Sequence, residues 1–268
     1  MRLIVSLIII SVSLAACQPE TTSESTAADS TPDPVNAMPT DSAENAQPVT
    51  LQASLAERSE ADRARDGGRK PAAVIEFLGI TPGMTVVDMF AAAGWYSEVL
   101  SHAVGAEGKV YAQNTEFLLT MRDGANDKAM AARLTAGRLG NVERLDRPLT
   151  DLGLADGSVD AVMFALNFHD LYNTGGAEAA KLLLMEGYKM LKPGGVFGLI
   201  DHVGTADNDN AELHRIETSK VLEVIALTPF SVEAESALLS NPADDHSASV
   251  FAPEIRGQTD RLLLRLRK

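Results

Sequence analysis

The chain has 268 residues, of which 45% are hydrophobic and 22% are charged, and its formal net charge is −14. This composition excludes a collagen, a wholly disordered protein and a multi-pass membrane protein. Lys and Arg total 23 against 37 Asp and Glu, so the average field repels nucleic-acid phosphates and anionic lipids and disfavours both as electrostatically bound partners.

The N-terminal residues hold the only cysteine, which excludes an intramolecular disulfide and a multi-cysteine zinc site. Arg2 is followed by an apolar run over residues 3–14, and two alanines directly precede Cys17. The run is shorter than the ~20 residues of a membrane-spanning helix. Residues 1–17 resemble a bacterial lipoprotein signal peptide with its lipobox. This resemblance implies a lipidated Cys17 and a domain anchored to the cell envelope, facing the periplasm; an uncleaved N-terminal anchor is the alternative.

Residues 18–50 contain no Lys, Arg or aromatic residue and are rich in Ser, Thr, Ala, Pro and acids. Such a segment cannot form a core, so we expect a disordered tether with an r.m.s. reach of roughly 30 Å. Residues 51–268 carry 22 basic and 31 acidic side chains, a net charge of −9. We expect one folded domain over these residues.

Within this domain short apolar runs alternate with helical stretches, a pattern typical of βαβ units. The predicted helices are residues 52–66, 71–80, 94–104, 116–139, 177–191 and 213–226. The predicted strands are residues 85–90, 109–114, 141–145, 159–168, 196–203, 231–239 and 260–268. The order predicts an α/β fold with a doubly wound, mostly parallel seven-stranded sheet and an antiparallel C-terminal strand pair.

The turn after the first predicted strand has the features of a ligand site. Asp88 ends the strand, three alanines and Gly94 follow, and a helix begins directly after them. Small side chains let a ligand approach the backbone, and the amides at a helix N-terminus point toward it. A NAD-type G-x-G-x-x-G site fits less well, because those glycines are absent and the acid precedes the turn.

Several further motifs follow in a characteristic order. They are RDGGRKP at 65–71, the aromatic pair Trp95-Tyr96, LKPGG at 191–195, Asp201-His202, NPADD at 241–245 and RGQTDR at 256–261. With the strand–turn–helix around Asp88, they make residues 55–268 resemble the class I S-adenosylmethionine-dependent methyltransferases, and among these a bacterial group of predicted methyltransferases. The resemblance implies a Rossmann-like fold and S-adenosylmethionine as cofactor.

The resemblance also implies roles for individual residues. The class has three glycines at alternate positions after the acid, and here Phe90, Ala92 and Gly94 occupy them. The carboxylate that binds the ribose is replaced by Gln113 or Asn114, and the acid near the adenine falls near Pro148, where Asp146 or Asp151 is the substitute. The implied cofactor-binding residues are Asp88, Phe90, Ala92, Gly94, Trp95, Tyr96, Gln113, Asn114 and Asn167.

Two His-Asp pairs follow the fourth and fifth predicted strands. They are His169-Asp170 and Asp201-His202. If these strands are neighbours, both pairs lie at one edge of the sheet, where His169 or His202 takes a proton from the acceptor while an aspartate orients the ring. The other three histidines have no metal-ligand spacing, so no metal site is predicted.

The sequence therefore predicts an exported, membrane-tethered methyltransferase that acts on a small-molecule acceptor. Because two of the three class glycines and the ribose acid are missing, the alternative is an inactive methyltransferase-like domain that binds another ligand or an envelope partner. The net charge opposes a nucleic-acid substrate, although the C-terminal RLLLRLRK is a local basic segment.

Overall fold

The computed structural model describes residues 50–268. The predicted signal peptide, its Cys17 and residues 18–49 of the predicted tether lie outside the described residues. The described part is one compact unit that begins by Leu51. None of its helices combines the length and the apolar character that crossing a membrane requires.

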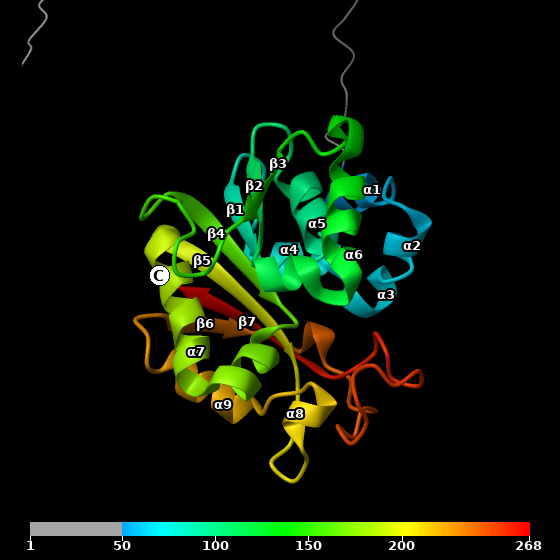
Figure 1. The fold of residues 1–268 in the computed structure, drawn as a ribbon, viewed down its shortest axis with the longest axis vertical. Helices are drawn as coiled ribbons and strands as arrows, with labels where there is room; N and C mark the ends of the chain where they lie inside the picture. The colour runs from blue at the N-terminus through cyan, green and yellow to red at the C-terminus, as the bar shows by residue number, and fades with distance from the viewer. Residues whose placement is uncertain (1–49) are drawn as a thin grey trace, which may run out of the picture. The chain divides into compact units, whose positions relative to one another are not determined.

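A seven-stranded sheet forms the centre of the fold, in the order β3-β2-β1-β4-β5-β7-β6 (Figure 1). Its strands are β1 Thr85–Met89, β2 Lys109–Asn114, β3 Val142–Asp146, β4 Val159–Ala165, β5 Leu191–His202, β6 Ser231–Glu235 and β7 Arg261–Arg267. The first five strands pair in parallel, while β7 is antiparallel to both β5 and β6. The predicted fold class and C-terminal pair are confirmed.

One face of the sheet is covered by helices from the N-terminal half of the domain. These are α1 Leu51–Leu55, α4 Pro71–Leu78 and α5 Trp95–Val104, with α6 Glu116–Leu134 beside α5 (Figure 1). Pro71 is the first residue of α4. Its missing backbone N–H costs nothing there, because the first N–H groups of a helix have no acceptor within the helix. The short helices α2 Glu60–Arg63 and α3 Asp66–Arg69 connect α1 to α4.

The opposite face is covered by α7 Phe168–Met190 and α9 Thr218–Ile225, and α8 Asn210–Leu213 precedes α9. Central strands are buried on both faces, as in most parallel sheets. In β1, for example, Val86 belongs to the core under α4 and α5, and Val87 to the core under α7. The sequences of the central strands are therefore nearly continuous apolar runs.

Several predicted boundaries are wrong. The fourth strand stops at Ala165 rather than residue 168, because Leu166 adopts a left-handed φ of 63° and α7 then begins at Phe168. The helix predicted over residues 213–226 begins only at Thr218, as α9, because His214, at φ 55°, ends the separate short helix α8 at Leu213. Residues 52–66 form separate short helices, since Ser59 caps a new one. The helix after β2 is interrupted at residues 121–124 and ends at Leu134.

Candidate active site

The carboxyl ends of β1, β4 and β5 lie at one edge of the sheet. Register pairs Met89 with Phe164 and Ala165 with Ile200, so the three strands end side by side. The segments that follow them carry the loop predicted to bind a cofactor and both His-Asp pairs. In open α/β sheets this edge is where ligands bind.

The loop after β1, residues 90–94, keeps an unusual backbone. Phe90, Ala92 and Gly94 have φ values of 54°, 50° and 79°. These are the three positions where the class has glycines, and the left-handed conformation is the one that glycine adopts without strain. The loop therefore has a glycine-like backbone at two non-glycine residues, an arrangement that costs on the order of 1–2 kcal/mol per residue.

Gln113 and Asn114 hold this loop in place. Gln113 Oε1 accepts from the backbone N–H of Phe90 at 3.1 Å, and Asn114 Oδ1 accepts from that of Ala92 at 2.8 Å. The other ends of the two amides donate to the carbonyls of Arg147 and Ala92. Both side chains are fully buried. Their hydrogen bonds offset part of the strain of the loop, a role that their position at the end of β2 did not reveal.

Asp88 lies beneath the loop and is buried. Its Oδ2 accepts a 2.6 Å hydrogen bond from Ser97 Oγ in the first turn of α5. Burial raises the pKa of Asp88 to about 7, against the opposing effects of the Ser97 hydrogen bond and the positive charge of Arg69. Asp88 thus ties the strand end to the helix that follows the loop.

Trp95 and Tyr96, predicted to line a ligand pocket, are buried in the core. The segment before β1 covers them: Trp95 Nε1 donates to the Asp62 carbonyl, and the guanidinium of Arg69 lies 4.6 Å from the Trp95 ring centroid. Arg133 of α6 joins this cover to the loop, donating to the Ala93 carbonyl and to both carboxylate oxygens of Asp62.

The two predicted His-Asp pairs interlock across β4 and β5. Asp201, fully buried, accepts from the His169 backbone N–H at 2.7 Å, and its Oδ1 lies 2.6 Å from His169 Nδ1. The partner of His169 is therefore the aspartate of the other pair as well as its neighbour Asp170. Burial lowers the pKa of His169, but the Asp201 carboxylate and Asp170 outweigh it and raise that pKa to about 10.

His202 differs from His169 in both charge and partners. Its Nδ1 lies 2.7 Å from Thr259 Oγ1, and its backbone N–H donates to Asp201. Burial lowers the pKa of His202 to about 3, so the ring is neutral. Within residues 50–268, Nε2 of His202 has no hydrogen-bond partner. Asn167, the predicted cofactor contact, is half-buried and donates to the Ala165 carbonyl.

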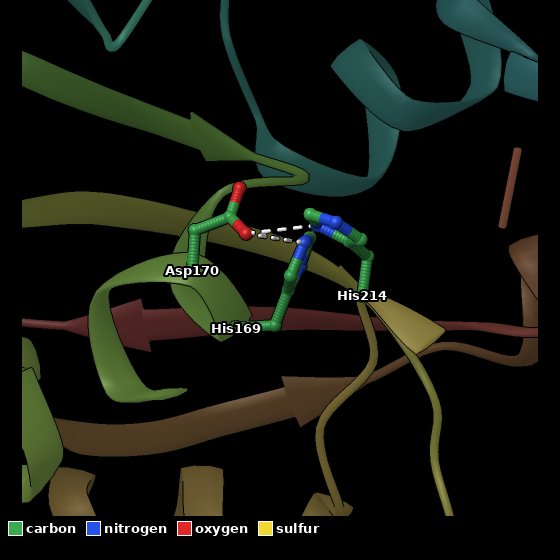
Figure 2. Close-up of side chains that lie close together, drawn as sticks. All are labelled: His169, Asp170 and His214. Atoms are coloured by element: carbon green, nitrogen blue, oxygen red, sulfur yellow. Dashed lines mark hydrogen bonds and ion pairs between the residues drawn. The ribbon is translucent and has the colours of Figure 1, made fainter. Parts of the chain in front are cut away.

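His214 lies beside the two His-Asp pairs, although no motif or spacing predicted this position. Its Nδ1 lies 3.0 Å from Asp170 Oδ1, and His169 Nε2 lies 3.3 Å from the same oxygen. Figure 2 shows the two rings converging on one carboxylate. His214 is 44 residues after Asp170 and comes from the end of α8.

A shallow hollow of about 450 Å³ lies beyond the ends of β2 and β3, beside α6. Glu116 at the start of α6 and Asp146 at the end of β3 both line it. Asp146, one of the two acids predicted near the adenine, is thus at a concave surface, whereas Asp151 lies in an exposed segment that lines a different hollow.

Comparisons with known proteins agree with this architecture. Residues 92–199 match the family described as a methyltransferase domain. A SAM-dependent methyltransferase from Aquifex aeolicus superposes with a TM-score of 0.54 at 21% identity, covering 74% of this chain and 88% of that one. An arsenic(III) S-adenosylmethionine methyltransferase from Chlamydomonas reinhardtii gives 0.51 at 15% identity, covering 83% and 74%. The comparison with curated proteins finds no match.

The structural likeness establishes the fold, which is that of Rossmann-like methyltransferases. The family match supports a SAM-dependent methyltransferase with S-adenosylmethionine as its cofactor. The matched residues begin inside the loop at Ala92, include Asn114, Asn167 and His169, and end in β5 before Asp201.

Proposed function

We propose that this chain transfers a methyl group from S-adenosylmethionine to a small-molecule acceptor at the edge formed by β1, β4 and β5. The observation that carries the proposal is the backbone of residues 90–94, which keeps the left-handed conformation at all three class glycine positions. Phe90 and Ala92 keep a strained backbone conformation, and such strain is concentrated at functional sites. Side-chain amides from β2 hold the loop in this conformation.

The residues present fit the cofactor at the loop. Helix α5 has no side-chain cap, and since the Ser97 amide already donates to Asp88, we assign a carboxylate of the ligand to the other amides of the first turn. Asp88 supplies a negative charge below the loop, suited to a cationic ligand. The amide of Asn114 is bound at both ends to Ala92, so we assign the ribose hydroxyls to the acids that line the neighbouring hollow, Glu116 and Asp146.

The chain's own groups at β4 and β5 would orient the acceptor and remove its proton. When bound, S-adenosylmethionine supplies an electrophilic methyl group on a sulfonium. Of the two predicted bases we assign the role to His202, because its ring is neutral and its Nε2 is unpartnered within the described residues, whereas both ring nitrogens of His169 face carboxylates. Asp201 positions both residues through their backbone amides.

Calorimetric titration of the full chain with S-adenosylmethionine and its demethylated product S-adenosylhomocysteine tests the proposal. We expect micromolar binding of both. Asp88→Asn keeps the shape that accepts the Ser97 hydrogen bond but removes the charge. At about pH 8, above the pKa of about 7 of Asp88, this variant should bind the methyl donor about tenfold more weakly, roughly 1.4 kcal/mol. The loss should be smaller for the product, which lacks the sulfonium charge.

Asp151→Asn is the matched control, because it removes the same charge from an exposed position. It should leave both affinities unchanged. If the folded wild-type chain binds neither ligand, the methyltransferase assignment fails. The second candidate function, a methyltransferase-like domain that binds another ligand or an envelope partner, would then be preferred. The observation in its favour is that Gln113 and Asn114, at the ribose position, are occupied by loop contacts.

We also propose that the domain is exported and held on the bacterial envelope through a lipidated Cys17, with residues 18–50 as the tether. The support is the sequence alone: an apolar segment, small residues before the cysteine and an acidic, Pro-containing stretch after it. Cys17→Ser should abolish incorporation of a labelled fatty acid and move the protein from the membrane fraction to the soluble fraction. Continued labelling of this variant would refute the anchor.

A further inference from the structure

Three side chains from two separate segments converge at the β4–α7 junction. His169 and Asp170 lie in the first turn of α7, and His214 ends α8. One ligand atom from each lies within 4.8 Å of the others, and the two pairs to Asp170 Oδ1 measure 3.3 and 3.0 Å. In Figure 2 both rings face the same carboxylate oxygen of Asp170.

These separations are those of metal ligands. Bonds of about 2.0–2.1 Å to a tetrahedral Zn²⁺ place neighbouring ligand atoms about 3.3 Å apart. The donor set of two imidazole nitrogens and one carboxylate oxygen suits zinc and similar transition ions, whereas magnesium and calcium prefer oxygen ligands. Two of the three separations therefore already match such an ion, and the third, between the two ring nitrogens, lies within 4.8 Å.

The surrounding structure keeps the three ligands in place. Asn173, one turn beyond Asp170, donates to the carbonyls of Asn210 and Arg215, which bracket α8, and so fixes α8 against α7. His214 adopts a left-handed φ of 55°, which turns the chain at the end of the helix. The Phe251 ring packs edge-on against the His214 ring, with 4.8 Å between the ring centroids.

The first ligand also has the partner that metal-bound histidines usually have. The Nδ1 of His169 lies 2.6 Å from buried Asp201, which leaves Nε2 to face the cluster. A carboxylate that accepts from the distal nitrogen fixes the tautomer and orientation of a ligating ring and increases its basicity. Asp201 therefore occupies the outer-shell position of a carboxylate–histidine–metal arrangement.

We propose that His169 Nε2, His214 Nδ1 and an Asp170 carboxylate oxygen bind one divalent transition-metal ion, of which Zn²⁺ is the best fit. The site is open on one side, because the Asp170 and His214 side chains are 51% and 38% exposed. Three protein ligands and an open position are typical of zinc sites that bind a water or a substrate atom as well. Metal binding itself requires no methyl donor, so this proposal stands independently of the proposed function.

The position of the site suggests what the open coordination place receives. The His169 and His202 rings are 5.8 Å apart, and both follow strands that end at the same edge as the loop of residues 90–94. An ion here would hold an oxygen, nitrogen or sulfur atom of a small molecule beside His202. This last step, unlike metal binding itself, rests on the proposed function: the site would then select acceptors that carry a metal-binding group.

The test is titration of the full chain, without a histidine tag and after removal of metals by a chelator, with Zn²⁺ alone, followed by calorimetry. We expect one ion per chain and a dissociation constant in the micromolar range or below, with no comparable binding of Mg²⁺. The visible spectrum of the Co²⁺-loaded chain should show the intense bands of a four-coordinate site. Both readouts are independent of methyl transfer.

Variants at the two half-exposed ligands should fold and still discriminate. His214→Ala and Asp170→Asn should each weaken Zn²⁺ binding at least 100-fold and remove the Co²⁺ bands. Asp201→Asn, a positioning change, should weaken binding by roughly 10–100-fold and shift the Co²⁺ bands without abolishing them. His102→Ala is the matched control, since His102 lies on α5 over the other face of the sheet, and it should change neither readout.

Two outcomes would overturn the proposal. One is a folded, metal-free chain that takes up no Zn²⁺ or Co²⁺. The other is binding that His214→Ala and Asp170→Asn leave intact, which would place the ion elsewhere. In either case the three side chains would be an ordinary hydrogen-bonded network. Loss of cofactor binding alone would not affect the result, because the titration contains no S-adenosylmethionine.

Discussion

Asp244→Ala is expected to lower the free energy of unfolding by about 3–5 kcal/mol, because it leaves a buried guanidinium without its counter-charge. Both carboxylate oxygens of Asp244 accept from Arg215, at 2.9 and 3.0 Å, and the Arg215 side chain is fully buried. The same carboxylate accepts from the backbone amides of His246 and Asp260. One substitution therefore breaks four hydrogen bonds: two join Arg215, before α9, to the long segment between β6 and β7, and two lie within that segment.

Urea unfolding of the full chain, followed by circular dichroism, measures this effect. Asp245→Ala is the matched control: its carboxylate is next in sequence but exposed, so the change should stay within about 0.5 kcal/mol. The double variant Arg215→Met/Asp244→Leu should recover much of the loss, because no buried charge is then left unpaired. If Asp244→Ala unfolds at the same urea concentration as the control, the ion pair does not hold these segments together.

The central elements could be predicted from the sequence because their causes are local. The strand around Val86 and Val87 is an apolar run between Gly83 and the small residues of the loop, and β2 lies where it was expected. The order of motifs then implied the sheet topology. Boundaries that depend on left-handed non-glycine residues, such as Leu166, could not be predicted, since no glycine or proline marks them.

The site was predictable to the same degree. Asp201 and His169 were expected to be close because neighbouring parallel strands end at one edge of the sheet, and this is confirmed. His214 could not be expected there, because α8 is placed by tertiary hydrogen bonds from Asn173. The partners of Gln113 and Asn114 depend on how the loop folds back onto β2, which no spacing in the sequence encodes.

Asp88 is expected to make the protein less stable as the pH rises, over a defined range. Burial raises the pKa of Asp88 to about 7 in the folded chain, from 3.8 for an ordinary aspartate. Below both values the carboxyl is protonated in the folded and the unfolded chain, and it contributes no pH dependence. Between them the unfolded chain releases the proton while the folded chain keeps it, so stability falls by about 1.4 kcal/mol per pH unit. Above about pH 7 the full penalty is present and constant.

The comparison that isolates this effect is wild type against Asp88→Asn, because every other titrating group cancels in the difference. The variant should match wild type at about pH 4 and be more stable by about 4 kcal/mol at about pH 8. Urea unfolding of both chains across this range measures it, with Asp151→Asn as an exposed control that should show no such divergence. A constant difference at all pH values would mean that Asp88 titrates normally. A divergence centred between the two pKa values would instead show that the chain keeps a destabilising charge beneath the loop, where a cationic cofactor would gain from it.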